Sequence, residues 1–151
     1  FSFTQEALGQ RPYMLYAPVQ TDKTAESAAE MLKEVKGVIG DRPLTGAEIA
    51  KIKANEVRSL PGAYETAGAV MATIGSNVLY GRPDDYVFKR KAAIEAITPA
   101  EVDAAAKTLD PNAITWVVVG DLKKTEAPIR ALNLGEVVIL DADGKPVPAT
   151  K

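Results

Sequence analysis

The feature that most constrains the fold is a helical spacing of apolar residues, which runs from residue 24 to residue 109 and is interrupted by turns. In each part, apolar side chains recur three or four positions apart, which is the spacing of one buried helix face. The turns lie at residues 40–43, 61–62, 81–84 and 110–113, and each contains a proline, which removes a backbone donor. We therefore predict about five helices, beginning near residues 24, 45, 67, 85 and 98.

Two of these helices begin with a capping box. A threonine is followed three positions later by a glutamate at Thr45 and Glu48, and again at Thr98 and Glu101. In this motif the threonine hydroxyl accepts a hydrogen bond from the backbone amide of the glutamate. The glutamate carboxylate in turn accepts one from the backbone amide of the threonine. The side chains expected to face inward from the five helices are Ala28, Leu32, Val35 and Ile39; Ile49, Ile52, Val57 and Leu60; Val70, Met71, Ile74 and Val78; Val87, Ile94 and Ile97; and Val102, Ala105, Ala106 and Leu109.

Strand patterns lie at both ends of the chain. Residues 1–5 and 13–20 favour an antiparallel hairpin, and residues 114–119 are apolar enough on both faces to form a central strand. Residues 136–140 and 145–147 predict two short strands, preceded by a helix at 122–132 that Pro128 should shorten or kink. This order predicts an α+β fold, with one mainly antiparallel sheet and a block of helices packed on one of its faces.

Length and composition favour a single domain over residues 1–151, with 133–151 as a C-terminal hairpin or tail. A chain of 151 residues, 46% of them apolar, is expected to form a compact domain that buries roughly 70% of its unfolded surface. Because Phe1 already lies in a predicted strand, we expect the chain to be a piece of a longer protein. A processed mature terminus is the alternative.

The chain contains no histidine and no cysteine, and this limits its chemistry. Histidine is the commonest zinc ligand and the usual general base near neutral pH, so a zinc hydrolase site cannot be built from this chain alone. No nucleophile, base and orienting group can be named together, so we predict neither catalytic nor metal-binding residues. A net charge of −2 without a basic cluster argues against nucleic acid as a partner, and the short apolar runs argue against membrane insertion.

The only candidate binding residues are two tyrosines in the second predicted strand. Tyr13 and Tyr16 are spaced so that an extended peptide could contact them as substrate. A half-buried sheet also favours aromatic residues at such positions, so a structural role is the alternative.

Four stretches of the sequence resemble segments of the insulinase (pitrilysin) family of zinc metallopeptidases. Residues 98–121 are similar to the segment in which a capped helix passes through an L-x-P turn into a strand ending V-V-G-D. Residues 44–49 resemble the family's L-T-x-x-E helix, and residues 79–86 its Y-G-x-P-x-x-Y turn. Residues 16–24 match a strand-to-helix corner, and the four stretches keep the family's order over residues 13–121.

The resemblance implies a non-catalytic, C-terminal chamber-forming domain. Such peptidases are clam shells of two homologous halves, and the catalytic half binds zinc through His-x-x-Glu-His, which this chain lacks. The family's R-x-x-x-G-Y segment is missing as well, so no catalytic residue carries over and the zinc belongs to the catalytic half. The implied partners are that half, on the same polypeptide or a separate one, and a peptide substrate; a homodimer is also allowed. The family resemblance favours the periplasm slightly over the cytoplasm.

Two other interpretations remain open. The chain could be a proteolytically inactive structural relative, like the core subunits of respiratory complexes that share this fold. It could also be an unrelated α+β module that binds peptides. A partner chain with the zinc motif would favour the peptidase, and a membrane complex would favour the structural subunit.

Overall fold

The computed structural model describes residues 1–147, which form a mixed α+β unit of helices and one small antiparallel sheet. Strand β1 pairs with β2 so that Phe3 lies opposite Met14. The elements of the described chain are β1 (Ser2–Thr4), β2 (Tyr13–Leu15), the 3₁₀ helix η1 (Thr21–Lys23), α1 (Thr24–Ile39), α2 (Gly46–Ser59), the 3₁₀ helix η2 (Leu60–Tyr64), α3 (Ala67–Leu79), α4 (Tyr86–Ala96), α5 (Pro99–Ala106) and α6 (Leu122–Ala131).

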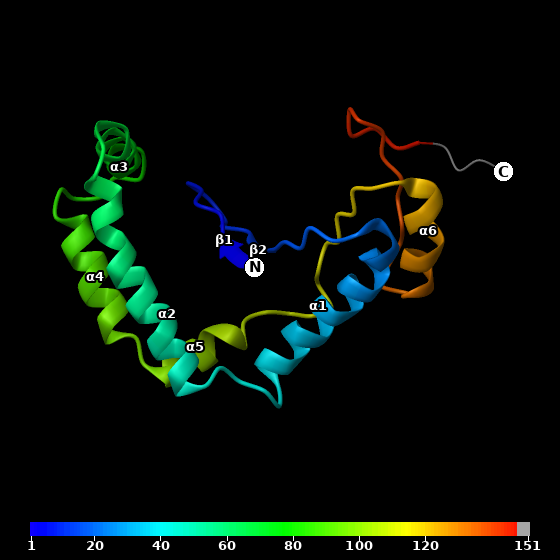
Figure 1. Cartoon of the computed structure of the whole chain (residues 1–151), viewed down its shortest axis with the longest axis horizontal. Helices are drawn as coiled ribbons and strands as arrows, with labels where there is room; N and C mark the ends of the chain where they lie inside the picture. Colours follow the sequence, from blue (N-terminus) through cyan, green and yellow to red (C-terminus); the bar gives the residue numbers. More distant parts are fainter. Residues whose placement is uncertain (148–151) are drawn as a thin grey trace.

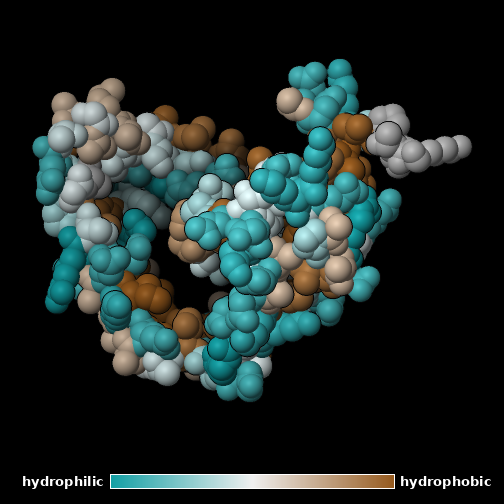
Figure 2. Space-filling model, turned by 45° about the vertical axis from the view of Figure 1, so that its right-hand side comes forward, coloured by the Kyte–Doolittle hydropathy of each residue, from teal (hydrophilic) through white to brown (hydrophobic). Residues whose placement is uncertain are grey.

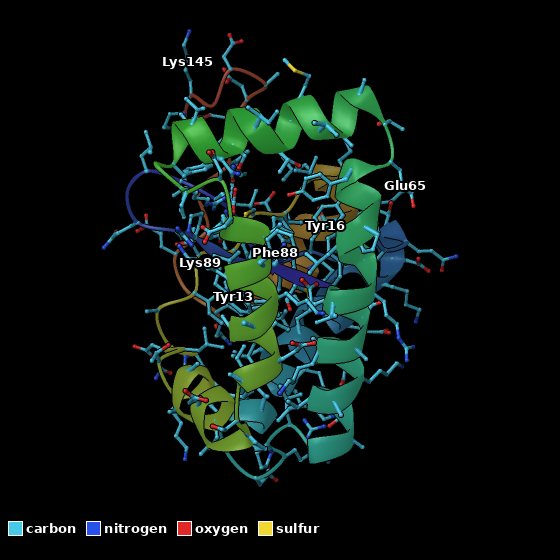
Figure 3. All side chains as sticks on the ribbon, turned by 90° about the vertical axis from the view of Figure 1, so that its left-hand side faces the viewer. Tyr13, Tyr16, Glu65, Phe88, Lys89 and Lys145 are labelled. Atoms are coloured by element: carbon cyan, nitrogen blue, oxygen red, sulfur yellow. The ribbon has the colours of Figure 1, made fainter. Side chains whose placement is uncertain are left out.

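The helices are arranged as an open arc (Figure 1). Helices α2 and α4 pack side by side in one arm, and α3 crosses their ends (Figure 3). Helices α1 and α6 pack together in the other arm, and the short α5 lies between the two arms. The hairpin β1–β2 lies on the concave side of this arc.

Both predicted capping boxes are confirmed at the starts of α2 and α5. The Thr45 hydroxyl accepts from the Glu48 amide at 3.3 Å, and the Glu48 carboxylate accepts from the Thr45 amide at 2.8 Å. Thr98 and Glu101 repeat this geometry with the same two distances. The first amides of each helix are thereby satisfied locally, so these helix starts depend little on the rest of the fold.

The apolar core of the described residues is very small. Its buried hydrophobic side chains are Ala28, Val35 and Ile49, and no large side chain is fully enclosed. The first helix buries its predicted stripe in part, but Ile52 in α2 is 53% exposed, so its predicted inward position is wrong. The reason is geometric: α2 packs along α4 on one side, and the Ile52 side chain is not on that side.

The chain exposes far more surface than a compact protein of its mass. Its accessible surface is 11539 Å² for 16.0 kDa, whereas a compact monomer of that mass exposes roughly 7,400 Å². An unfolded chain of this mass would expose roughly 23,000 Å², so folding removes about half of it from water. The expected burial of roughly 70% is therefore wrong for this arrangement. The chain therefore exposes about 4,100 Å² more accessible surface than a compact monomer of the same mass.

Helix α3 shows where part of that surface lies. Met71, Ile74 and Val78 are 68%, 52% and 78% exposed, so their predicted burial is wrong. At Gly68 and Gly75 the position that a Cβ would take is open, because no atom lies within 4 Å of it apart from the chain neighbours and the nearby backbone of the same helix. Figure 2 shows hydrophobic residues on the outside of the molecule and a hollow between its arms.

The predicted central strand at residues 114–119 is not part of a sheet. The segment runs extended between α5 and α6, and no backbone hydrogen bond involving it occurs among the described residues. Val117 and Val119 are 83% and 94% exposed. A strand becomes a sheet member only when a second backbone lies about 5 Å away, and the described chain supplies none here.

The C-terminal part is simpler than predicted. Helix α6 continues past Pro128 to Ala131, so the proline does not restrict it to a first turn. The two expected strands are reduced to one bridge between Leu140 and Pro146, around a turn in which Gly144 has φ 77°. Positive φ explains the glycine at this position. The end of the predicted 133–151 tail, residues 148–151, lies outside the described residues.

The first prediction concerns the small core. We expect Ile49→Ala to lower the free energy of unfolding by about 2–4 kcal/mol, because the buried side chain leaves a cavity. The matched control Ile52→Ala, on the exposed side of the same helix, should change it by less than about 0.5 kcal/mol. Urea unfolding followed by helical circular dichroism measures both. Equal losses in the two variants would contradict the packing described here.

Candidate functional site

The two predicted binding tyrosines lie on the hairpin and its continuation. Tyr13 is in β2 opposite Thr4, and Tyr16 follows β2, with its amide donating to the Phe1 carbonyl at 2.9 Å. Their exposed fractions are 45% and 53%. The Tyr16 ring also lies 5.3 Å from the Phe1 ring, between centroids. Both side chains remain accessible to a ligand.

The strand geometry separates the two tyrosines. Successive side chains of an extended strand point to opposite faces, so residues three positions apart do not share one face. A peptide laid flat on one face of the hairpin would therefore contact Tyr13 or Tyr16, and a peptide along its edge could contact both. Figure 3 locates both residues on the hairpin, seen past α2 and α4.

A second cluster, which we name the Arg82 corner, joins this hairpin to the helices. The Arg82 guanidinium lies 4.7 Å and 4.6 Å from the ring centres of Tyr80 and Tyr86. It donates to the Ser76 hydroxyl at 3.0 Å and to the Glu6 carboxylate at 2.5 Å. With two rings covering it, the Arg82 side chain is only 13% exposed. This ion pair links positions 76 residues apart.

The turn between α3 and α4 orients this arginine. Gly81 has φ 62°, which glycine adopts without strain, and the Arg82 amide donates to the Asn77 carbonyl at 2.8 Å. Residues 79–86 resemble a turn of the insulinase family in sequence, but that resemblance predicts no role for Arg82. The available signal was an arginine between two tyrosines next to a glycine-proline turn, a composition suited to cation–π stacking.

Electrostatics at the corner favour the ionised pair. The hydrogen bond from Arg82 lowers the pKa of the Glu6 carboxyl below its ordinary value of 4.5, and the nearby charge of Arg11 acts in the same direction. The pKa of Arg82 is raised, chiefly by the same bond. Such a pair holds the loop of the hairpin against the α3–α4 turn.

The Arg82 corner does not form a nucleophilic site. The Ser76 hydroxyl accepts a hydrogen bond from Arg82, and a guanidinium has no acceptor that could take the serine proton. Within residues 1–147 no group of three or more histidine, cysteine, aspartate or glutamate side chains is placed to hold a metal ion. Among the described helices, none is long and apolar enough to cross a bilayer. Since the contacts of Arg82 join the loop of the hairpin to the turn between α3 and α4, we call the Glu6–Arg82 pair a clasp.

Polar contacts also join the two helices of one arm. Lys53 on α2 donates to the carbonyls of Glu95 and Ile97 at 2.7 and 2.8 Å, at the C-terminal end of α4. Arg90 on α4 donates to Glu56 on α2 at 2.9 Å. A cation at the carbonyl end of a helix is favoured by the helix dipole, so Lys53 has a structural role.

A depression of about 730 Å³ lies along α2. Its walls come from a single helix and the residue before its cap, so polar groups from different elements do not converge on a ligand as they do in most binding sites. The lining residues are Leu44, Glu48, Lys51, Ile52, Ala54, Asn55 and Arg58.

Comparisons with family models, with curated proteins and with solved structures gave no match. The resemblance to the insulinase family therefore rests on the four sequence stretches alone.

The second prediction concerns the Glu6–Arg82 pair. Because folding lowers the Glu6 pKa, the stabilisation is present above the ordinary glutamate value of 4.5 and is lost as pH falls through the lowered value. Glu6→Gln should therefore remove part of the acid-side loss of stability, by less than about 1 kcal/mol for so exposed a carboxylate. Thermal unfolding between pH 7 and pH 3 measures the difference. The control is Glu65→Gln, at an exposed glutamate between η2 and α3. A Glu6→Gln profile parallel to that of the unmodified chain would contradict the clasp.

Proposed function

We propose that this chain is a non-catalytic, chamber-forming domain of an insulinase-family zinc metalloendopeptidase. It would help to enclose a peptide and hold it beside zinc that is bound by His-x-x-Glu-His in another part of the assembly. The observation that carries the proposal is that the described chain leaves about 4,100 Å² more surface exposed than a compact protein of 16.0 kDa. We expect this property in a domain whose faces are covered by the other domains of a closed shell.

The chemistry of the chain supports a positioning role. Peptide hydrolysis at zinc requires a metal-bound water and a base to accept its proton, and a chain without histidine lacks the usual ligands for that metal. Holding the peptide in register with such a centre needs only a shaped surface and hydrogen-bonding groups. The open arc and its hairpin supply these.

Tyr13 and Tyr16 are the residues that we propose to contact the peptide. Both are about half exposed, and the hairpin that carries them lies on the concave side of the arc. The Glu6–Arg82 clasp joins the loop of this hairpin to the turn between α3 and α4. An extended peptide along the edge of the hairpin would stack on aromatic rings and pair with main-chain groups.

A structural subunit of the same fold, without proteolysis, is the second candidate. The same exposed surface favours it, because a scaffold in a larger complex also has most of its faces covered. An unrelated α+β module that binds peptides would use the same hairpin. The partner separates these candidates, since only the peptidase pairs this chain with a zinc-binding polypeptide.

The third prediction concerns metal and activity. The purified chain alone should bind no stoichiometric zinc and should not cleave a quenched fluorescent peptide. Mixed with a polypeptide of the family that carries His-x-x-Glu-His, it should increase that polypeptide's cleavage rate, and a chelator should abolish the cleavage. Metal analysis by mass spectrometry and the fluorescence assay measure the two parts. One tightly held zinc per isolated chain, or no effect on the partner, would overturn the proposal.

The fourth prediction concerns the tyrosines in that mixed assay. Tyr13→Ala and Tyr16→Ala should each raise KM about three- to tenfold with little change in kcat, a loss of about 0.7–1.4 kcal/mol of binding. Tyr64→Ala, at a tyrosine of similar exposure in η2, is the matched control and should leave KM unchanged. A fall in kcat alone, or equal effects of all three changes, would contradict a peptide-contacting role.

A further inference from the structure

We propose that residues 1–16, which we name the strap, swing away from the concave side of the arc as one unit when the Glu6–Arg82 pair opens, while the helices keep their fold. The hydrogen bonds of the strap are internal. The main chains of Phe1 and Tyr16 exchange two of them, at 3.1 and 2.9 Å, and β1 pairs with β2 between these ends. Opening the Glu6–Arg82 pair therefore breaks no hydrogen bond within the strap.

The strap has little else that attaches it to the helices. Within residues 1–147, the Glu6–Arg82 pair is the only hydrogen bond or ion pair that joins the strap to the rest of the chain. No residue of the strap is buried, and all except Ala7 and Leu15 are exposed. Because so little apolar surface is covered here, the ion pair decides whether the strap is held.

The connection between the strap and α1 allows this movement. Residues 17–19 are exposed, and they take part in no backbone hydrogen bond among the described residues. Hydrogen bonding resumes at Gln20, whose carbonyl accepts from the Lys23 amide at 2.9 Å. A few loop residues with free backbone groups can absorb the dihedral changes of a hinge without losing a hydrogen bond.

The helical side of the clasp is complete without the strap. The rings of Tyr80 and Tyr86 and the Ser76 hydroxyl hold the Arg82 guanidinium, and the arginine side chain is 13% exposed. The Glu6 side chain is 50% exposed, so it is the member of the pair that can leave. An ion pair that lies half in water is weak and is screened by salt. The closed and open positions therefore differ little in free energy, as a movable strap requires.

Movement of the strap changes access to the concave side of the arc. The hairpin lies on that side in Figure 1, and the space-filling view in Figure 2 shows the hollow between the two arms. Tyr13 and Tyr16 are carried by the strap and move with it. The inference depends on how the strap is attached, and it holds whether or not the chain belongs to a peptidase.

The test measures the separation of the strap from the helices in the complete 151-residue chain. The sequence contains no cysteine, so spin labels attach only where cysteines are introduced. One pair of labels, at Gln10→Cys and Phe88→Cys, spans the strap and α4. A second pair, at Met71→Cys and Phe88→Cys, spans α3 and α4 and serves as the reference. All three native side chains are exposed. Pulsed electron paramagnetic resonance gives the distribution of distances for each pair.

The decisive variant is Glu6→Gln, which removes the charge and keeps the size of the side chain. In the unmodified chain we expect one narrow main distance between strap and α4. In Glu6→Gln the ratio of open to closed molecules should rise about fivefold, with the reference distance unchanged. The matched control Glu65→Gln, at an exposed glutamate between η2 and α3, should leave both distances unchanged. About 1 M sodium chloride should open the unmodified chain and should have little effect on Glu6→Gln.

Three results would overturn the inference. The first is the same narrow distribution in Glu6→Gln as in the unmodified chain, because the pair would then not hold the strap. The second is a broad distribution in the unmodified chain, which would mean that the strap is not held at all. The third is a broader reference distance in Glu6→Gln, because the helices would then lose their arrangement together with the strap.

Discussion

The structure depends on how little apolar surface the chain covers by itself. Hydrophobic burial is the main favourable contribution to folding, at about 25 cal/mol per Å². Here only Ala28, Val35 and Ile49 supply a buried apolar core in the described residues, and about half of the unfolded surface stays in water. The small core goes together with the open arc in Figure 1, in which apolar side chains of α3 and of residues 114–119 stay exposed.

Local interactions stabilise helices that bury little apolar surface. The two capping boxes satisfy the first amides of α2 and α5 within four residues of sequence. Side-chain bonds from Lys53 to the end of α4, and from Arg82 to the hairpin, then connect elements that are far apart in the sequence. Such bonds fix geometry well but contribute only about 0.5–3 kcal/mol each, so they organise surfaces without replacing a core. This combination suits a domain whose shape is set in advance and whose stability is completed by a partner.

The sequence predicted what local physics determines. The starts of the helices near residues 24, 45, 67, 85 and 98 agree with the structure within about one turn, because caps and prolines act within a few residues. Periodicity also identified the apolar face of α3, but it could not say what covers Met71 or Val78. The prediction of a strand at residues 114–119 was wrong for the same reason. The pairing of a strand depends on a second backbone that is not its neighbour in the sequence. The Arg82 corner was missed because its carboxylate partner, Glu6, lies 76 positions away.

Small-angle X-ray scattering of the purified, monomeric chain tests the central claim most directly. A compact domain of 151 residues has a radius of gyration of roughly 15 Å, and an unfolded chain of that length roughly 40 Å. The account predicts a folded, helical monomer whose radius lies clearly above the compact value and well below the unfolded one. A helical monomer that scatters with a radius near 15 Å would mean that the chain covers its own apolar faces, and the case for a completing partner would fail.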